Sequence, residues 1–259
     1  DLNNVDDAGN SFNIDFDNRS VDVQNVRMAS GESPEACARR LRFEALDQLM
    51  DQHQADLVAL GHTRDDQVEE VLIRLIRGSG MNGLSGMRAK NKHIIRPLLN
   101  SSKEEILDYL ATADVPFCTD SSNVSRPYLR NKIRLELIPL LEQEFNPSIR
   151  QTVLNTAAIL REEDSYLDEL TESHYHRVVK DRAVSLSSSY ERSYRINVFM
   201  ELAAALRRRV LEKLFWQAGC PPTFQAIEEI IKLTEQGRTG TTIHFSGGLR
   251  ITKTAGEIV

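Results

Sequence analysis

The sequence has 259 residues, of which 41% are hydrophobic and 27% are charged, and its formal net charge is −6. This composition excludes a disordered or collagen-like chain, because it holds enough apolar residues for a packed core. The acidic balance argues against non-specific nucleic-acid binding, since affinity for phosphate depends largely on Lys and Arg that displace counterions.

The sequence also indicates the cellular compartment of the protein. No apolar run approaches the ~18 residues of a membrane span, and the opening residues Asp1–Asn4 are not typical of a signal peptide. Cys37, Cys118 and Cys220 lie far apart without a C-x-x-C pair, which argues against a disulfide framework, a zinc site or a redox motif. We therefore expect a cytoplasmic protein with reduced thiols and no membrane partner.

Apolar periodicity and capping residues predict alternating helices and short strands in the first part of the chain. Residues 1–20 are polar and predict a loop or the remainder of an incomplete domain start. The elements predicted next are a strand end at 21–23, a helix from Ser33-Pro34 to Asp51, a buried strand at 56–61, a helix ending before Gly78, a strand at 93–96, a capped helix from Ser102, and a helix at 127–144 that bends at Pro139. This succession is typical of an α/β protein with a parallel sheet.

The rest of the chain predicts a helical connector and a smaller α+β domain. A long polar helix at 148–174 carries only a narrow apolar stripe. Two further helices, at 202–216 and 223–234, precede a hairpin whose apolar arms flank Ser246–Gly248. We place the domain boundary between residues 147 and 148.

Polar residues after the first buried strand are the first candidates for a functional site. Ligands of open parallel sheets bind at the carboxyl ends of strands, which is where Gly61 and His62 follow. Thr63 and Asp66 have the spacing of a capping box, so capping and catalysis explain Asp65 and Asp66 equally well. A histidine beside two carboxylates also suits a nucleotide with its magnesium ion, because hard cations prefer oxygen ligands.

Several cations are further candidates. Arg42 borders the buried stripe of its helix, where it either extends to solvent or reaches a phosphate. Arg130 and Arg134 are one helical turn apart and could hold a single anion. The basic runs at 88–96, 126–134 and 207–213 are each, taken alone, more typical of a solvated face than of a binding surface.

Several blocks of the sequence, in one order, resemble the tRNA(Ile)-lysidine synthetase family. The blocks are Leu60–Glu69, Arg77–Leu84, Ile95–Leu99, Asp120–Asn123 followed by Arg130–Arg134, Ala205–Val210 and Gly247–Arg250. The resemblance implies an adenine nucleotide α-hydrolase-like PP-loop domain, incomplete at its N-terminus, at residues 1–147. It also implies that residues 148–259 form a helical linker and a tRNA-binding or substrate domain.

The resemblance further implies a ligase that uses ATP and Mg²⁺ to adenylate the C2 oxygen of the wobble cytidine in a minor tRNA(Ile) with a CAU anticodon. Free L-lysine then displaces AMP to give lysidine, which changes codon reading from AUG to AUA. The residues implied are His62, Asp66, Arg42 and Arg134 for catalysis; Gly61, His62, Asp65, Arg130 and Asn131 for ATP; Asp66 for the metal; and Arg88, Arg207, Arg208, Arg209 and Lys213 for tRNA.

The sequence departs from the family in one motif. The phosphate loop Ser-Gly-Gly-x-Asp-Ser does not occur in it, and Ser246-Gly247-Gly248 continues as Leu249-Arg250. We therefore expect these 259 residues alone to be inactive, as a fragment. Two alternatives stay open: another PP-loop tRNA-modifying enzyme such as a thiolating one, which the missing C-x-x-C disfavours, and a non-catalytic tRNA-binding fragment. A homodimer is one option for the assembly.

Overall fold

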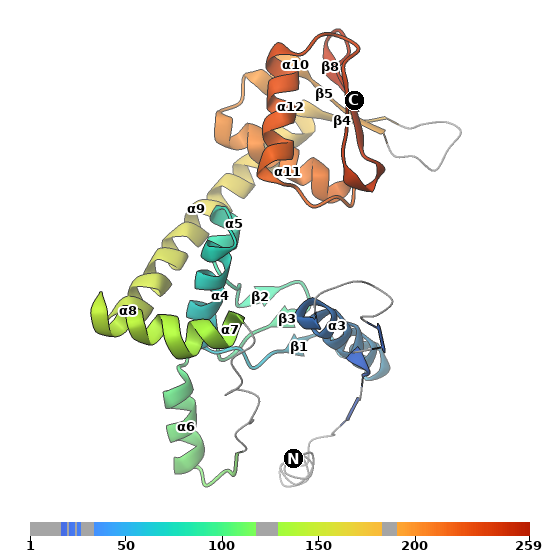
Figure 1. The fold of residues 1–259 in the computed structure, drawn as a ribbon. Helices are drawn as coiled ribbons and strands as arrows, with labels where there is room; N and C mark the ends of the chain where they lie inside the picture. Colours follow the sequence, from blue (N-terminus) through green and yellow to red (C-terminus); the bar gives the residue numbers. More distant parts are fainter. Residues whose placement is uncertain (1–16, 20, 24, 27–33, 118–128, 183–190) are drawn as a thin grey trace. The chain divides into compact units, whose positions relative to one another are not determined.

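A computed structural model describes residues 17–19, 21–23, 25–26, 34–117, 129–182 and 191–259 (Figure 1). The chain divides into two compact units between Arg161 and Glu162. This division falls within the long helix α9 (Ile149–Val178), and the boundary predicted from the sequence lies at the start of that helix. The predictions for Ser33, Cys118, Asp120–Asn123 and Arg126 concern residues outside the described ones.

The first unit alternates helices with short strands, as predicted. Its elements are α3 (Pro34–Gln52), β1 (Val58–Ala59), α4 (Arg64–Ile76), α5 (Met81–Leu84), β2 (Lys90–Asn91), β3 (Ile94–Ile95), α6 (Lys103–Thr112), α7 (Leu129–Lys132), the π-helical turn η2 (Ile133–Leu137), α8 (Ile138–Glu144) and the first part of α9. β1 and β3 pair in parallel, with Val58 opposite Ile94. The parallel pair is thus confirmed, whereas the antiparallel pairing of β2 with β3 was not predicted.

Capping boxes start the two helices α4 and α6, as the sequence predicts. The Thr63 hydroxyl accepts a hydrogen bond from the Asp66 amide, and Asp66 Oδ2 accepts one from the Thr63 amide at 2.8 Å. Ser102 and Glu105 form the equivalent pair at α6. These side chains satisfy amides that have no partner inside a helix, which fixes where each helix begins.

A π-helical turn stands where the sequence predicts a bend at Pro139. The Ile138 amide donates to the carbonyl of Ile133, five residues earlier. Pro139 has no amide hydrogen, and in an α-helix its ring would clash with the carbonyl of Leu135. In an α-helix, side chains five residues apart point about 140° apart. The wider turn instead allows Ile133 and Ile138, 1% and 0% exposed, to pack in the same cluster with α4.

The second unit contains two small antiparallel sheets and three helices after α9. Its elements are β4 (Val179–Arg182), β5 (Glu191–Arg195), α10 (Ile196–Met200), α11 (Ala204–Gln217), α12 (Phe224–Gln236), β6 (Thr242–His244), the 3₁₀ turn η3 (Ser246–Gly248), β7 (Arg250–Thr252) and β8 (Glu257–Ile258). β5 lies between β4 and β8, while β6 and β7 form the predicted hairpin with Ile243 opposite Ile251. Among all described residues, no helix has the length and apolar character needed to cross a membrane.

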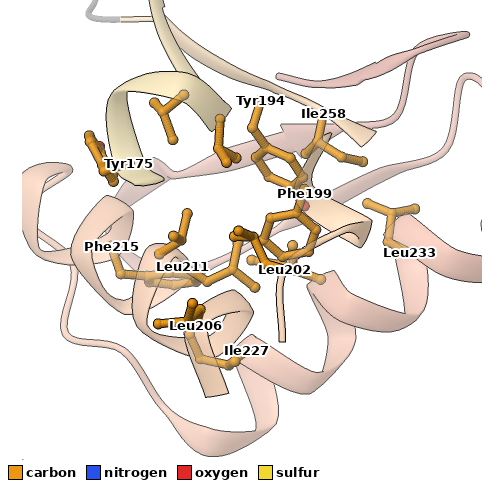
Figure 2. Close-up of a cluster of buried hydrophobic side chains, with 14 of the residues drawn as sticks. Tyr175, Tyr194, Phe199, Leu202, Leu206, Leu211, Phe215, Ile227, Leu233 and Ile258 are labelled. Atoms are coloured by element: carbon orange, nitrogen blue, oxygen red, sulfur yellow. The ribbon is translucent and has the colours of Figure 1, made fainter. Parts of the chain in front are cut away.

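The core of the second unit surrounds two aromatic rings (Figure 2). The rings of Tyr194 on β5 and Phe199 on α10 have centroids 4.5 Å apart, and Phe199 is 0% exposed. The Tyr194 hydroxyl lies 2.6 Å from Thr234 Oγ1 of α12, so the buried phenol has a polar partner. Burial raises the pKa of Tyr194 and keeps the phenol neutral.

Replacing Phe199 by alanine removes this buried ring. We expect Phe199→Ala to lower the free energy of unfolding by about 3–5 kcal/mol, because a cavity replaces close contacts. Phe224→Ala is the matched control, since Phe224 is 74% exposed, and we expect it to change stability by about 0.5 kcal/mol. Urea denaturation followed by circular dichroism measures both, and equal losses would contradict this assignment of the core.

Candidate functional site

The strand predicted as buried at 56–61 forms only as the two-residue β1, in which Val58 is half-buried and Ala59 exposed. The polar residues predicted at its carboxyl end follow it there. The Leu60 amide donates to the carbonyl of Ile95 at 2.9 Å, which extends the contact between β1 and β3. Gly61 is exposed and His62 is half-buried, directly before the cap of α4. The chain therefore delivers His62 to the edge of the sheet where α/β proteins bind ligands.

Asp66, Glu69, Arg130 and Arg134 form a cluster that we call the paired-arginine cluster. Glu69 is 1% exposed, and its carboxylate accepts from Arg130 Nε at 2.8 Å and from Arg134 Nε at 2.6 Å. Asp66 Oδ1 lies 3.4 Å from a terminal nitrogen of each arginine. The predicted pairing of Arg130 with Arg134 is thus present, and both arginines converge on α4.

The negative and positive side chains of the paired-arginine cluster offset one another. The hydrogen bond that Arg134 donates to Glu69 is the main cause that raises the pKa of Arg134, and the charges of Glu69, Asp66 and Asp65 add to it. Two carboxylates therefore offset two guanidinium groups. The side chains of Arg130 and Arg134 remain 27% and 31% exposed, so a ligand from solvent can reach them.

His62 lies in a different electrostatic setting. Burial is the main cause that lowers its pKa, and the charges of Arg96, Arg130 and Arg39 lower it further, whereas Asp66 opposes the shift. Its Nδ1 atom is buried, and no described residue offers it a hydrogen-bond partner. The lowered pKa keeps the imidazole neutral near pH 7.

Sequence reasoning missed three charged residues of this region. Glu69 is one helical turn after Asp66, and its burial depends on partners 61 and 65 residues away. Arg96, only 8% exposed, directly follows β3; the rule that selected His62 after β1 would have selected it as well. Arg39 of α3 influences the pKa of both His62 and Arg96.

Like Gly61 and His62, the predicted ATP-binding residues Asp65 and Asn131 and the predicted catalytic residue Arg42 are not part of the paired-arginine cluster. Asp65 Oδ1 accepts from Arg150 at 3.0 Å and Oδ2 accepts from the Lys103 amide at 2.8 Å. Asn131 is half-buried on α7. Arg42 is exposed on α3, and the electrostatic influence on His62 comes from Arg39 of the same helix.

The cations predicted to bind tRNA on α11 are engaged with acids of the second unit. Arg207 pairs with Glu235, Arg208 with Glu228, Arg209 with Asp164 and Asp168, and Lys213 with Glu172. Arg209 is the most enclosed, because its side chain is 13% exposed and Asp164 is 0% exposed. Arg88, in the first unit, is exposed.

The described residues contain no group of three or more His, Cys, Asp or Glu side chains arranged to hold a metal ion. Cys37 and Cys220, the described cysteines, are both buried and unbridged. The site thus consists of a neutral histidine at a strand end, the buried Arg96 and a carboxylate-held arginine pair. Such an arrangement can bind and orient a phosphate-bearing ligand.

Comparison with known proteins identifies the class to which this chain belongs. The PP-loop domain family matches residues 1–141, more than half of the chain, which makes this a PP-loop protein. The chain is 33% identical over 239 residues to the tRNA(Ile)-lysidine synthase of Geobacillus kaustophilus, with 89% of this chain and 50% of that protein covered. It is 30% identical over 250 residues to the tRNA(Ile)-lysidine synthase of Thermobifida fusca, with 95% of this chain and 74% of that protein covered.

The chain therefore belongs to the tRNA(Ile)-lysidine synthase family, as the sequence blocks indicated. It spans about half the length of several relatives, such as the Geobacillus kaustophilus and Bacillus subtilis proteins.

Glu69 is expected to hold the paired-arginine cluster together. Glu69→Gln keeps the size of the side chain but removes the charge that both arginines need, so we expect the free energy of unfolding to fall by about 1–3 kcal/mol. Glu104→Gln, on the exposed surface of α6, is the matched control. Chemical denaturation compares the two variants, and an unchanged stability of Glu69→Gln would contradict the structural role.

His62 should make stability depend on pH. The unfolded chain binds a proton at this imidazole near its ordinary pKa of about 6.5, whereas the folded chain binds it only at lower pH. Stability is therefore lost as pH falls below about 6.5, and His62→Gln should reduce that loss. Urea midpoints measured across this range for both proteins provide the test, and parallel pH profiles would contradict it.

Proposed function

We propose that the protein is a tRNA(Ile)-lysidine synthase, which joins lysine to the wobble cytidine of a tRNA(Ile) with a CAU anticodon. The observation that carries the proposal is the convergence of His62, Asp66, Arg130 and Arg134 at the carboxyl end of β1 in a chain of this family. The reaction proposed is the one that the names of the relatives state, and the site contains charged side chains and an imidazole suited to it.

The proposed reaction has two steps. The C2 oxygen of the cytidine attacks the α-phosphorus of ATP, and pyrophosphate leaves with the electrons of the broken P–O bond. An amine of free lysine then attacks C2, and AMP leaves as the C–O bond breaks. Arg134 and Arg130 would offset the negative charge that builds on the phosphates in the first step.

His62 suits the second step. An attacking amine must be neutral, and a lysine amine carries a proton at pH 7. A neutral imidazole can accept or orient such a proton, and His62 is only half-buried at the strand end. We assign His62 this role, and we assign Gly61 and Asn131 to the surroundings of ATP.

Asp66 is the side chain that would contact Mg²⁺. This ion keeps several waters and uses one or two carboxylates together with substrate phosphates, so a single aspartate suffices. Asp66 Oδ2 is held by Thr63, and its Oδ1 faces both arginines. Contact with the ion would therefore require Oδ1 to exchange an arginine for the metal.

Arg88 and the cations of α11 other than the enclosed Arg209 are our first candidates for contact with tRNA. Arg208 lies over the ring of Phe224 at 5.0 Å, and Phe224 is 74% exposed. An arginine beside an exposed aromatic ring is a combination that binds nucleic-acid backbones and bases. Arg207, which like Arg208 pairs with an acid of α12, and Lys213, which pairs with Glu172 of α9, are further candidates. The enclosed pair of Arg209 with Asp164 gives Arg209 a structural role as well.

Removing the charge of Asp66 tests the activation step. Asparagine can keep the cap of α4, so Asp66→Asn should abolish ATP–pyrophosphate exchange by the natural full-length protein while its circular dichroism spectrum stays unchanged. Asp108→Asn on the exposed face of α6 is the matched control and should keep full exchange activity. If the Asp66→Asn variant retains ATP–pyrophosphate exchange activity, Asp66 acts only in the capping box of α4.

The tRNA surface can be tested without disturbing the core. The double variant Arg207→Ala, Arg208→Ala leaves Arg209 with its buried partner and should weaken tRNA binding. It should also reduce the slope of log affinity against log salt concentration by about 1 for each phosphate that these arginines neutralise in the wild type. Filter binding at several salt concentrations measures both quantities, and an unaltered affinity and slope would remove this surface from the proposal.

A further inference from the structure

Asp65 connects elements at the start of α4, one helical turn before Glu69 of the paired-arginine cluster. Its Oδ2 accepts from the Lys103 amide at the start of α6, and its Oδ1 accepts from Arg150 Nη1 in the first turns of α9. The Arg64 amide also donates to the Ser101 carbonyl at 2.9 Å, which joins the starts of α4 and α6 through the backbone as well. Both oxygens of Asp65 thus serve contacts within the protein.

Arg150 extends this connection to α8. Its Nε donates to Glu142 Oε1 at 2.7 Å, while its Nη1 contacts Asp65 at 3.0 Å. A single guanidinium therefore joins the beginning of α4 to the end of α8. Planar guanidinium groups suit this task because their donors have a fixed geometry.

The helix that this guanidinium holds is the one that carries the arginine pair. α7, η2 and α8 follow one another from Leu129 to Glu144, with Arg130 and Arg134 near the beginning and Glu142 near the end. In the middle, Ile133 and Ile138 pack with α4. The helix is thus held against α4 at one end by Asp66 and Glu69 and at the other end by Asp65 through Arg150.

We propose that Asp65 is a positioning residue, which acts through Arg150 and Glu142 to set where α7, η2 and α8 lie on α4 and hence where Arg130 and Arg134 point. The inference rests on the proposed function, in which these arginines contact ATP. Consecutive aspartates then divide two tasks: Asp66 faces the arginines, and Asp65 holds the helix that presents them.

The exposure of the three groups favours a role in position over one in stability. Asp65, Arg150 and Glu142 have side chains 29%, 37% and 30% exposed. Ion pairs this accessible to water add little to the free energy of folding. A small displacement of a catalytic group, in contrast, can lower a rate by an order of magnitude or more.

The test compares Asp65→Asn, Arg150→Met and the double variant with Arg64→Met as the matched control. Arg64 pairs with Glu105 at the same helix start, is 39% exposed, and contacts neither α8 nor α9 through that pair. Hydrogen exchange of the Arg130 and Arg134 Nε–H groups, measured by NMR on the 259-residue chain, reports the arginine positions. ATP–pyrophosphate exchange by the natural full-length protein reports kcat and the KM for ATP.

We expect Asp65→Asn and Arg150→Met each to speed Nε–H exchange of Arg134 and to lower kcat by about tenfold. The double variant should match the single variants, because all three break one connection, and Arg64→Met should resemble the wild type. If Arg150→Met unfolds, Glu142→Gln weakens only the ion pair between Arg150 and α8 and takes its place.

Two results would overturn the inference. Unchanged Nε–H exchange in both single variants would show that the connection does not position the arginines. A raised KM for ATP in Asp65→Asn with normal behaviour of Arg150→Met would show that Asp65 contacts the nucleotide itself. If the natural protein lacks ATP–pyrophosphate exchange altogether, the proposed function fails, while the NMR measurement still decides the positioning role.

Discussion

A buried carboxylate that binds two arginines is the interaction on which the first unit depends. Glu69 is nearly inaccessible to solvent, and a lone buried charge would be costly there. Arg130 and Arg134 satisfy it through the hydrogen bonds of their guanidinium groups. The same bonds fix both arginines beside Asp66, so the requirement to satisfy one buried group also preorganises the cations that the proposed chemistry needs.

This arrangement has a consequence for ligand binding. The arginines are balanced by carboxylates of the protein before any substrate arrives, so an incoming phosphate meets positioned donors with little excess charge. The region around His62 is different, because Arg39 and Arg96 add positive charge to a half-buried imidazole. The proposed phosphate and amine chemistry would thus take place in neighbouring environments that share Asp66 and Arg130.

Local sequence signals predicted much of the fold. Thr63 and Ser102 cap the helices that they were expected to cap, and the hairpin pairs Ile243 with Ile251 as its alternation indicated. These features depend on contacts within a few residues along the chain. The bend expected at Pro139 became a π-helical turn, because burying Ile133 and Ile138 together outweighed regular helical geometry.

The sequence by itself determined the longer helices, the caps of α4 and α6, the strand end that carries His62 and the family to which the chain belongs. Only the tertiary structure decided which oppositely charged side chain each ionic residue pairs with. Spacing along a helix places Asp65, Asp66 and Glu69 on faces of α4, but it does not reveal what packs on each face. Arg150 and Arg134 reach those faces from far along the chain, and α11 likewise meets acids of α9 and α12 that no local pattern connects to it.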